Sequence, residues 1–116
     1  MDFYDIQELY IKRVDQWAEQ NKQWLEDRNW EFTPHARRIC ASALMTRDNI
    51  ETYPGHFVSA IVSNKLRETF GRADTECNRC LNALLMGYWN VETWDLSKQW
   101  DLVNKTNEVT TTDDAG

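Results

Sequence analysis

The chain has 116 residues, which is enough for one domain with its own hydrophobic core. Hydrophobic residues make up 41% and six residues are Trp, which excludes a largely disordered chain, while four Gly and two Pro leave few places to turn a sheet. No apolar run is long enough to span a membrane, the acidic start does not resemble a signal peptide, and three Cys suit a reducing compartment, so we expect a cytoplasmic protein.

The net charge of −6 is unevenly distributed along the chain. Residues 1–33 carry a net charge of −4, residues 34–90 carry +2, and residues 91–116 carry −4. Affinity for nucleic acid comes from clustered positive charge, so this distribution makes nucleic acid an improbable partner of the whole protein. It leaves room for an anion site in the basic centre.

Residues 2 to about 28 contain no Gly or Pro, and their aromatic residues recur every seven positions: Phe3, Tyr10, Trp17 and Trp24. This spacing predicts one long amphipathic helix with an aromatic stripe on one face. The stripe suits either of two roles. It can cover the chain's own core, or it can bind a second copy or another protein, because Trp and Tyr dominate interface energetics. Tyr10, Trp17 and Trp24 are therefore our candidate interaction residues.

A second helix is expected after Thr33, which offers a capping hydroxyl directly before Pro34 at the first helical position. It should end near Asp48 and Asn49, because Asn tolerates the left-handed conformation used at helix ends.

Pro54 and Gly55 can open a third helix that runs through Phe70. Gly71 is suited to stop that helix and Asp74 to cap a fourth, which should end around residue 90. The third and fourth helices would then form a hairpin around this turn.

A short last helix is expected from about residue 95, capped by Asp95 or Ser97 and carrying Leu96, Trp100 and Val103 on its apolar face. The fold class we predict is all-α. It is a compact bundle of four to five helices with a long N-terminal helix, a helical hairpin as the core and a short C-terminal helix. The domain spans residues 1–105, and residues 106–116, which lack an apolar period, are expected to form a disordered tail.

Several stretches of the centre form one pattern: residues 54–66, the run Gly71-Arg72-Ala73-Asp74, then Asn78, followed by Trp94 and Trp100. Over residues 54–102 this pattern resembles a group of short uncharacterised proteins that are abundant in bacteriophage and prophage genomes. The resemblance implies a phage origin, and the group has no general activity that could be carried over.

The chain departs from that group at two places. Lys65 stands where the group usually has Asp, so no role of an acidic residue at that position is carried over. The helix predicted over residues 2–28 is not a usual part of the short members, which suggests an added interaction surface.

Cys77 and Cys80 have the spacing of half a zinc site or of a redox pair. The only residues that could complete a zinc site by type are Cys40, His35 and His56. A zinc knuckle usually places such a pair in a turn, whereas these two Cys lie on the apolar face of a predicted helix. A buried pair of thiols is the more economical interpretation, so we expect no metal and no cofactor.

The best polar constellation gathers around the turn between the third and fourth helices: Asn64, Arg72, Asp74 and Asn78. These residues can simply cap helices and bridge backbone groups. In the alternative, the basic centre holds a small anionic ligand or a nucleotide through four candidate residues: Arg37, Arg38, Arg72 and Arg79.

A helical hairpin over residues 60–85 also resembles a helix-turn-helix, with Asn78, Arg79 and Asn82 on the would-be recognition helix. Helical hairpins of this kind are generic and do not by themselves indicate DNA binding. A DNA-binding regulator is therefore only the third alternative. No nucleophile with its base can be argued, and we do not expect an enzyme. The sequence thus favours a phage-encoded interaction protein that binds a host or phage protein, with homodimerisation open, and that inhibits host defence or nucleic-acid processing.

Overall fold

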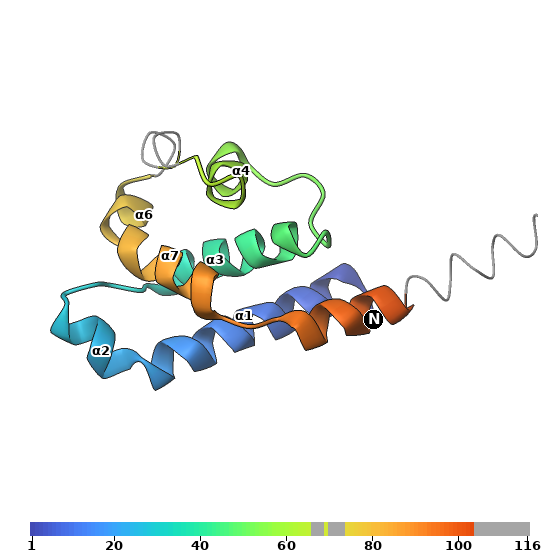
Figure 1. Ribbon diagram of the computed structural model, residues 1–116, viewed down its shortest axis with the longest axis horizontal. Coiled ribbons are helices and arrows are strands. Elements are labelled where there is room, and N and C mark those ends of the chain that lie inside the picture. The colour runs from blue at the N-terminus through green and yellow to red at the C-terminus, as the bar shows by residue number, and fades with distance from the viewer. Residues whose placement is uncertain (66–68, 70–73, 104–116) are drawn as a thin grey trace, which may run out of the picture.

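The computed structural model describes residues 1–65, 69 and 74–103, which form seven helices and no strand (Figure 1). The all-α prediction is confirmed. The described residues contain more helices than the four to five predicted, because the sequence pattern does not show where two of the long helices are interrupted.

The first helix is α1, Phe3–Gln20, and a short helix α2, Lys22–Asp27, follows it. Asp2 caps α1, since its side chain accepts the backbone N–H of Asp5. The single helix predicted over residues 2–28 is broken at Asn21, whose side-chain amide donates to the carbonyl of Trp17 at 2.9 Å. An Asn side chain that bonds to the local backbone competes with the helical pattern, which explains the break.

The central helix is α3, Pro34–Arg47. Thr33 caps it as predicted, with its hydroxyl accepting the N–H of Ala36, and Asn49 adopts the predicted left-handed conformation at φ 62°. Helix α3 contacts α1, α4 and α7, and its small buried residues, such as Ala36 and Ala43, let these helices approach closely.

The third predicted helix is shorter than expected. It is α4, His56–Val62, and Asn64 adopts a left-handed conformation at φ 58° immediately after it. The prediction of one helix through Phe70 is therefore wrong, because a positive φ cannot continue a right-handed helix. Residue 70 itself and the predicted stop at residue 71 lie outside the described residues.

The fourth predicted helix is divided at Cys80 into α6, Thr75–Arg79, and α7, Leu81–Asn90. Asp74 caps α6 as predicted. Helix α7 packs tightly on α3, since a Cβ on Gly87 would lie 3.1 Å from Cys40 Sγ and 3.2 Å from Phe32 Cζ. The absence of a side chain at Gly87 therefore allows this approach.

The last helix covers residues 94–103 and runs alongside the N-terminal half of α1 (Figure 1). Arg13 of α1 forms a bidentate ion pair with Asp95, at 2.8 Å for both bonds. Because the helix already begins at residue 94, Asp95 and Ser97 lie inside its first turns and do not precede it as caps. The tail predicted for residues 106–116 lies outside the described residues.

The core lies where α3 meets α1 and α7, and it contains fully buried side chains from all three helices: Ile6, Tyr10, Val14, Cys40, Leu44 and Leu84. Helix α4 covers the face of α3 that points away from α1 (Figure 1). Within the described residues, no helix combines the length and the apolar character needed to cross a bilayer.

Candidate functional site

The aromatic stripe of α1 faces mainly inward. Tyr10 has an exposed fraction of 0%, so its side chain belongs to the core and is not at the surface. Trp17 packs edge-on against Phe32 with ring centroids 6.1 Å apart, and Trp24 lies on α2 in a similar arrangement with Trp30 at 5.4 Å. These two Trp are partly buried against the core. They remain candidate interaction residues only through the part of each side chain that is still exposed.

The hydroxyl of Tyr10 joins a network of polar side chains at the end of α3. It donates to Asp48 Oδ2 at 2.7 Å, and Thr93 donates to the same oxygen at 2.6 Å. Arg47 donates to Asp48 Oδ1 at 3.0 Å and to the hydroxyl of Thr93 at 2.8 Å. Burial and the hydrogen bond to Asp48 raise the pKa of Tyr10 well above its usual value, so the phenol is a donor at neutral pH.

Three members of this network, Arg47, Asp48 and Thr93, line a groove of about 620 Å³ between the end of α3 and the connection from α7 to the last helix, and we refer to these three as its base. Two large aromatic side chains line the same groove from opposite ends of that connection. Trp89 is 59% exposed and Trp94 is 69% exposed, and between them Glu92 adds an exposed carboxylate. The groove therefore combines two exposed aromatic rings with a base fixed by hydrogen bonds.

Sequence reasoning did not select Trp89 or Trp94 as site residues. The sequence does contain a signal that these two Trp are exposed, because each lies outside the positions that form the apolar face of its own helix. In α7 the buried face is set by Leu81 and Leu84, and in the last helix Leu96 is buried. A Trp that falls off the buried face of an amphipathic helix must face solvent or a partner.

The three candidate arginines that the structure describes have different surroundings. Arg37 donates to the carbonyl of Phe32 at 2.9 Å and pairs with Asp15 and Glu19 at 3.4 and 3.6 Å. Arg79 pairs with Glu31, and Arg38 is exposed on α3. The fourth, Arg72, lies outside the described residues.

Arg37 also lines a second cavity, of about 510 Å³, between α2 and the start of α3. Three carboxylates line the same cavity: Glu19, Glu26 and Glu31. Because these three carboxylates outnumber the two cations that line the cavity, Lys22 and Arg37, the lining does not favour a phosphate group.

A separate cluster of ligand-type side chains lies where α6 begins beside the start of α3. Asp74 Oδ2 lies 3.3 Å from His35 Nε2, and Asp74 Oδ1 accepts the N–H of Cys77 at 2.7 Å. The hydrogen bonds from the backbone and the side chain of Cys77, then the contact with His35, lower the pKa of Asp74, so its carboxylate is ionised at neutral pH. Burial and the neighbouring carboxylate raise the pKa of the Cys77 thiol to about 12.

The three Cys residues are buried and none forms a disulfide. Cys80 does not point into the cluster, since its thiol faces the hydroxyl of Thr33 at 3.8 Å. Burial raises the pKa of Cys40 far above its usual value, so this thiol is not a nucleophile at neutral pH.

Compared with models of known families, with curated proteins and with solved structures, the chain has no match. The groove and the cluster must therefore be interpreted from their own chemistry.

Proposed function

We propose that this chain is a phage-encoded, non-enzymatic interaction protein of the host cytoplasm. Its partner is a host protein that processes nucleic acid, and binding inhibits that protein. The docking surface is the groove that contains Trp89 and Trp94.

The observation that carries the proposal is the exposure of two Trp side chains at one groove. A Trp left 59% or 69% exposed keeps a large apolar area in water, which costs free energy unless a partner covers it. Trp is also the residue type most enriched at the energetic centres of protein interfaces. The hydrogen-bonded base, built on Asp48, supports the proposal because a preorganised surface loses little entropy on binding.

The charge of the chain favours a basic partner. Its net charge is −6, and the exposed Glu92 lies between the two Trp. The ring of Trp94 already holds a cation within the chain, since Lys98 Nζ lies 4.0 Å from its centroid. An Arg or Lys of a partner can stack on Trp89 in the same way, with Glu92 as its counter-ion. Proteins that bind nucleic acid present such cations on their surfaces.

The other two hypotheses have less support. A nucleotide site would need free cations, whereas Arg37 and Arg79 already pair with carboxylates. A DNA-binding hairpin would need a recognition helix with free polar residues. Helix α6 has only five residues, and one of them, Arg79, already pairs with a carboxylate.

The test compares two variants in the full-length chain. Trp89 and Trp94 are both replaced by Ala, and in the control variant Tyr53 is replaced by Ala, which removes an aromatic side chain that is 92% exposed and lies outside the groove. Proteins captured from host lysate at low salt are identified, and their affinity and nucleic-acid-processing activity are then measured with purified components.

We expect a basic partner whose activity falls when the wild-type chain binds. The double variant should lose affinity by at least about 30-fold, as for an interface centre worth 2 kcal/mol, while the control keeps it. Affinity should also decrease as salt rises. Equal binding by the double variant, no specific partner at low salt, or a homodimer that the double variant abolishes would each refute the proposal for this surface.

A further inference from the structure

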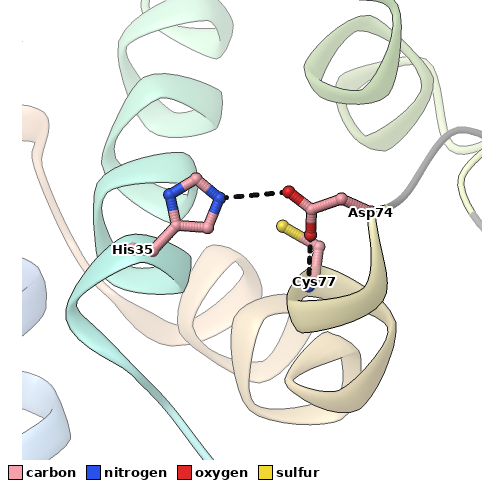
Figure 2. Close-up of side chains that lie close together, drawn as sticks. All are labelled: His35, Asp74 and Cys77. Atoms are coloured by element: carbon pink, nitrogen blue, oxygen red, sulfur yellow. Dashed lines mark hydrogen bonds and ion pairs between the residues drawn. The ribbon is translucent and has the colours of Figure 1, made fainter.

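Three side chains that commonly bind metal ions meet at the junction between α3 and α6 (Figure 2). They are His35 in the first turn of α3, Asp74 at the start of α6 and Cys77 in the first turn of α6. One ligand atom of each residue lies within 4.8 Å of the ligand atoms of the other two. They offer a nitrogen, an oxygen and a sulfur to the same small volume.

The position of the Asp74 carboxylate is fixed by the fold. Its Oδ1 caps α6 by accepting the N–H of Cys77 at 2.7 Å, and its Oδ2 is left to face His35 Nε2 at 3.3 Å (Figure 2). A ligand oriented by a second hydrogen bond is the usual arrangement in metal centres. One oxygen thus has a structural role while the other remains available to a metal ion.

Two further polar contacts hold α6 against the chain that leads into α3. Thr33 donates to the carboxylate of Glu76, and Arg79 pairs with Glu31. Three alternate residues therefore contact α6 or its cap: Glu31 contacts Arg79, Thr33 contacts Glu76, and His35 contacts Asp74. These contacts fix the position of α6 beside the start of α3 on one side of the cluster.

Access to the cluster differs among its members. The side chains of His35 and Asp74 are 48% and 59% exposed, whereas Cys77 is buried at 1%. An ion can therefore enter from solvent between the imidazole and the carboxylate, and the sulfur then binds it from the protein side.

The ligand types select the ion. An imidazole nitrogen, a carboxylate oxygen and a thiolate sulfur are the three ligand classes that Zn²⁺ takes in proteins. Bond lengths of about 2.0–2.3 Å in a tetrahedral site place neighbouring ligand atoms roughly 3.5 Å apart. The ligand atoms of the cluster are at most 4.8 Å apart, so shifts of roughly 1 Å bring them to that spacing, and three protein ligands leave the fourth position to water.

We propose that His35, Asp74 and Cys77 bind one zinc ion, which clips the start of α6 to the start of α3. On binding, the hydrated ion gives up water ligands, the thiol proton of Cys77 passes to solvent, and the contact between His35 and Asp74 is replaced by one bond to the metal from each of the three residues. The site lies outside the Trp89–Trp94 groove and does not depend on its function. It differs from the site that the Cys77–Cys80 spacing suggested, because Cys80 faces Thr33.

The alternative is that Asp74 only caps α6 and pairs with His35 while Cys77 fills the core. Five single variants of the full-length chain separate the two interpretations. Cys77→Ser and His35→Gln remove ligands, whereas the controls Cys80→Ser and His56→Gln alter the same residue types outside the cluster. Asp74→Asn keeps the cap, since Asn caps as well as Asp, and removes only the charge.

The chelator-treated proteins are titrated with Co²⁺, which gives a charge-transfer absorption band only when a thiolate is bound, and then with Zn²⁺ in competition. Wild type and both controls should bind one equivalent with this band. Cys77→Ser should lose the band, and His35→Gln and Asp74→Asn should each bind at least tenfold more weakly. Zn²⁺ should also raise the unfolding temperature of wild type but not of Cys77→Ser, because it binds the folded state.

Circular dichroism of each variant without metal shows whether it folds, and His35→Gln keeps the test valid should Cys77→Ser not fold, since His35 is half exposed. Binding below one equivalent in wild type, a band that persists in Cys77→Ser, or unchanged affinity in His35→Gln would overturn the proposal. A band lost only in Cys80→Ser would do the same.

Discussion

The aromatic residues of α1 and those of the groove share residue types but differ in surroundings. Tyr10 has no exposed surface and donates a hydrogen bond to Asp48, whereas Trp94 is 69% exposed and lines the same groove as Asp48. One polar network thus contacts a buried aromatic side chain that stabilises the fold and lies beside an exposed one, which we propose binds a partner. Aromatic content alone does not locate an interface, and the position of each ring relative to the apolar face of its helix does.

The largest expected effect is at Tyr10. Tyr10→Ala should lower the free energy of unfolding by about 3–5 kcal/mol, because it removes a fully buried ring and leaves a cavity. Tyr10→Phe keeps the ring and should cost about 1–2 kcal/mol through the lost hydrogen bond. Urea denaturation of both variants measures the difference. A cost below 1 kcal/mol for Tyr10→Ala would remove the distinction between the two aromatic groups.

Trp17 tests whether the stripe of α1 is uniform. Its ring packs against Phe32 but is only partly buried, so Trp17→Ala should cost about 2 kcal/mol, less than Tyr10→Ala. The same denaturation experiment measures this cost, and sedimentation shows whether the oligomeric state changes. A fully stable variant with an altered oligomeric state would instead assign Trp17 to an interface.

The contact between α1 and the last helix should depend weakly on pH. The hydrogen bonds from Arg13 hold the pKa of Asp95 at about 2, below the value of about 3.9 for an unfolded aspartate. The pair therefore stabilises the fold above about pH 4, and this contribution is lost as the pH falls toward 2. Because Asp95 is largely exposed, Asp95→Asn should cost less than about 1 kcal/mol at pH 7.

Urea denaturation at pH 7 and at pH 2 measures this effect, with Glu8→Gln as a control for the loss of one exposed charge on α1. The difference between wild type and Asp95→Asn should vanish near pH 2. An equal difference at both pH values would show that the stabilisation does not come from the charge of Asp95.

The smallest expected effect on stability is at the groove. Trp89→Ala and Trp94→Ala should each change the free energy of unfolding by about 0.5 kcal/mol or less, because their side chains are mostly in water. Thermal or urea unfolding checks this. A loss comparable to that of Tyr10→Ala would place these Trp in the core and remove the basis for the docking surface.

The sequence predicted the helix boundaries that depend on local chemistry. Thr33 and Asp74 cap helices, and Asn49 ends one, because each effect involves backbone groups within a few residues. It did not predict the breaks at Asn21, Asn64 and Cys80, since each of these residues also occurs inside helices. At Asn21 the break accompanies a hydrogen bond to the nearby Trp17 carbonyl, which the sequence pattern alone does not reveal.

The candidate sites divide in the same way. The sequence offered the metal-binding residue types, yet Cys80, which its spacing paired with Cys77, does not belong to the cluster of His35, Asp74 and Cys77. His35 and Asp74 are 39 residues apart, and no periodicity relates them. The arginines were grouped by charge along the chain, and the structure distributes Arg37 and Arg79 to different carboxylates.

By itself, the sequence determined an all-α chain with a stripe of aromatic residues on its first helix, because periodicity and capping are local properties of the backbone. Only the tertiary structure decided that α3 is the centre, that Tyr10 is buried while Trp89 and Trp94 are not, and that His35 meets Asp74 and Cys77. These outcomes follow from how helices pack against one another, and packing depends on contacts between residues far apart in the chain.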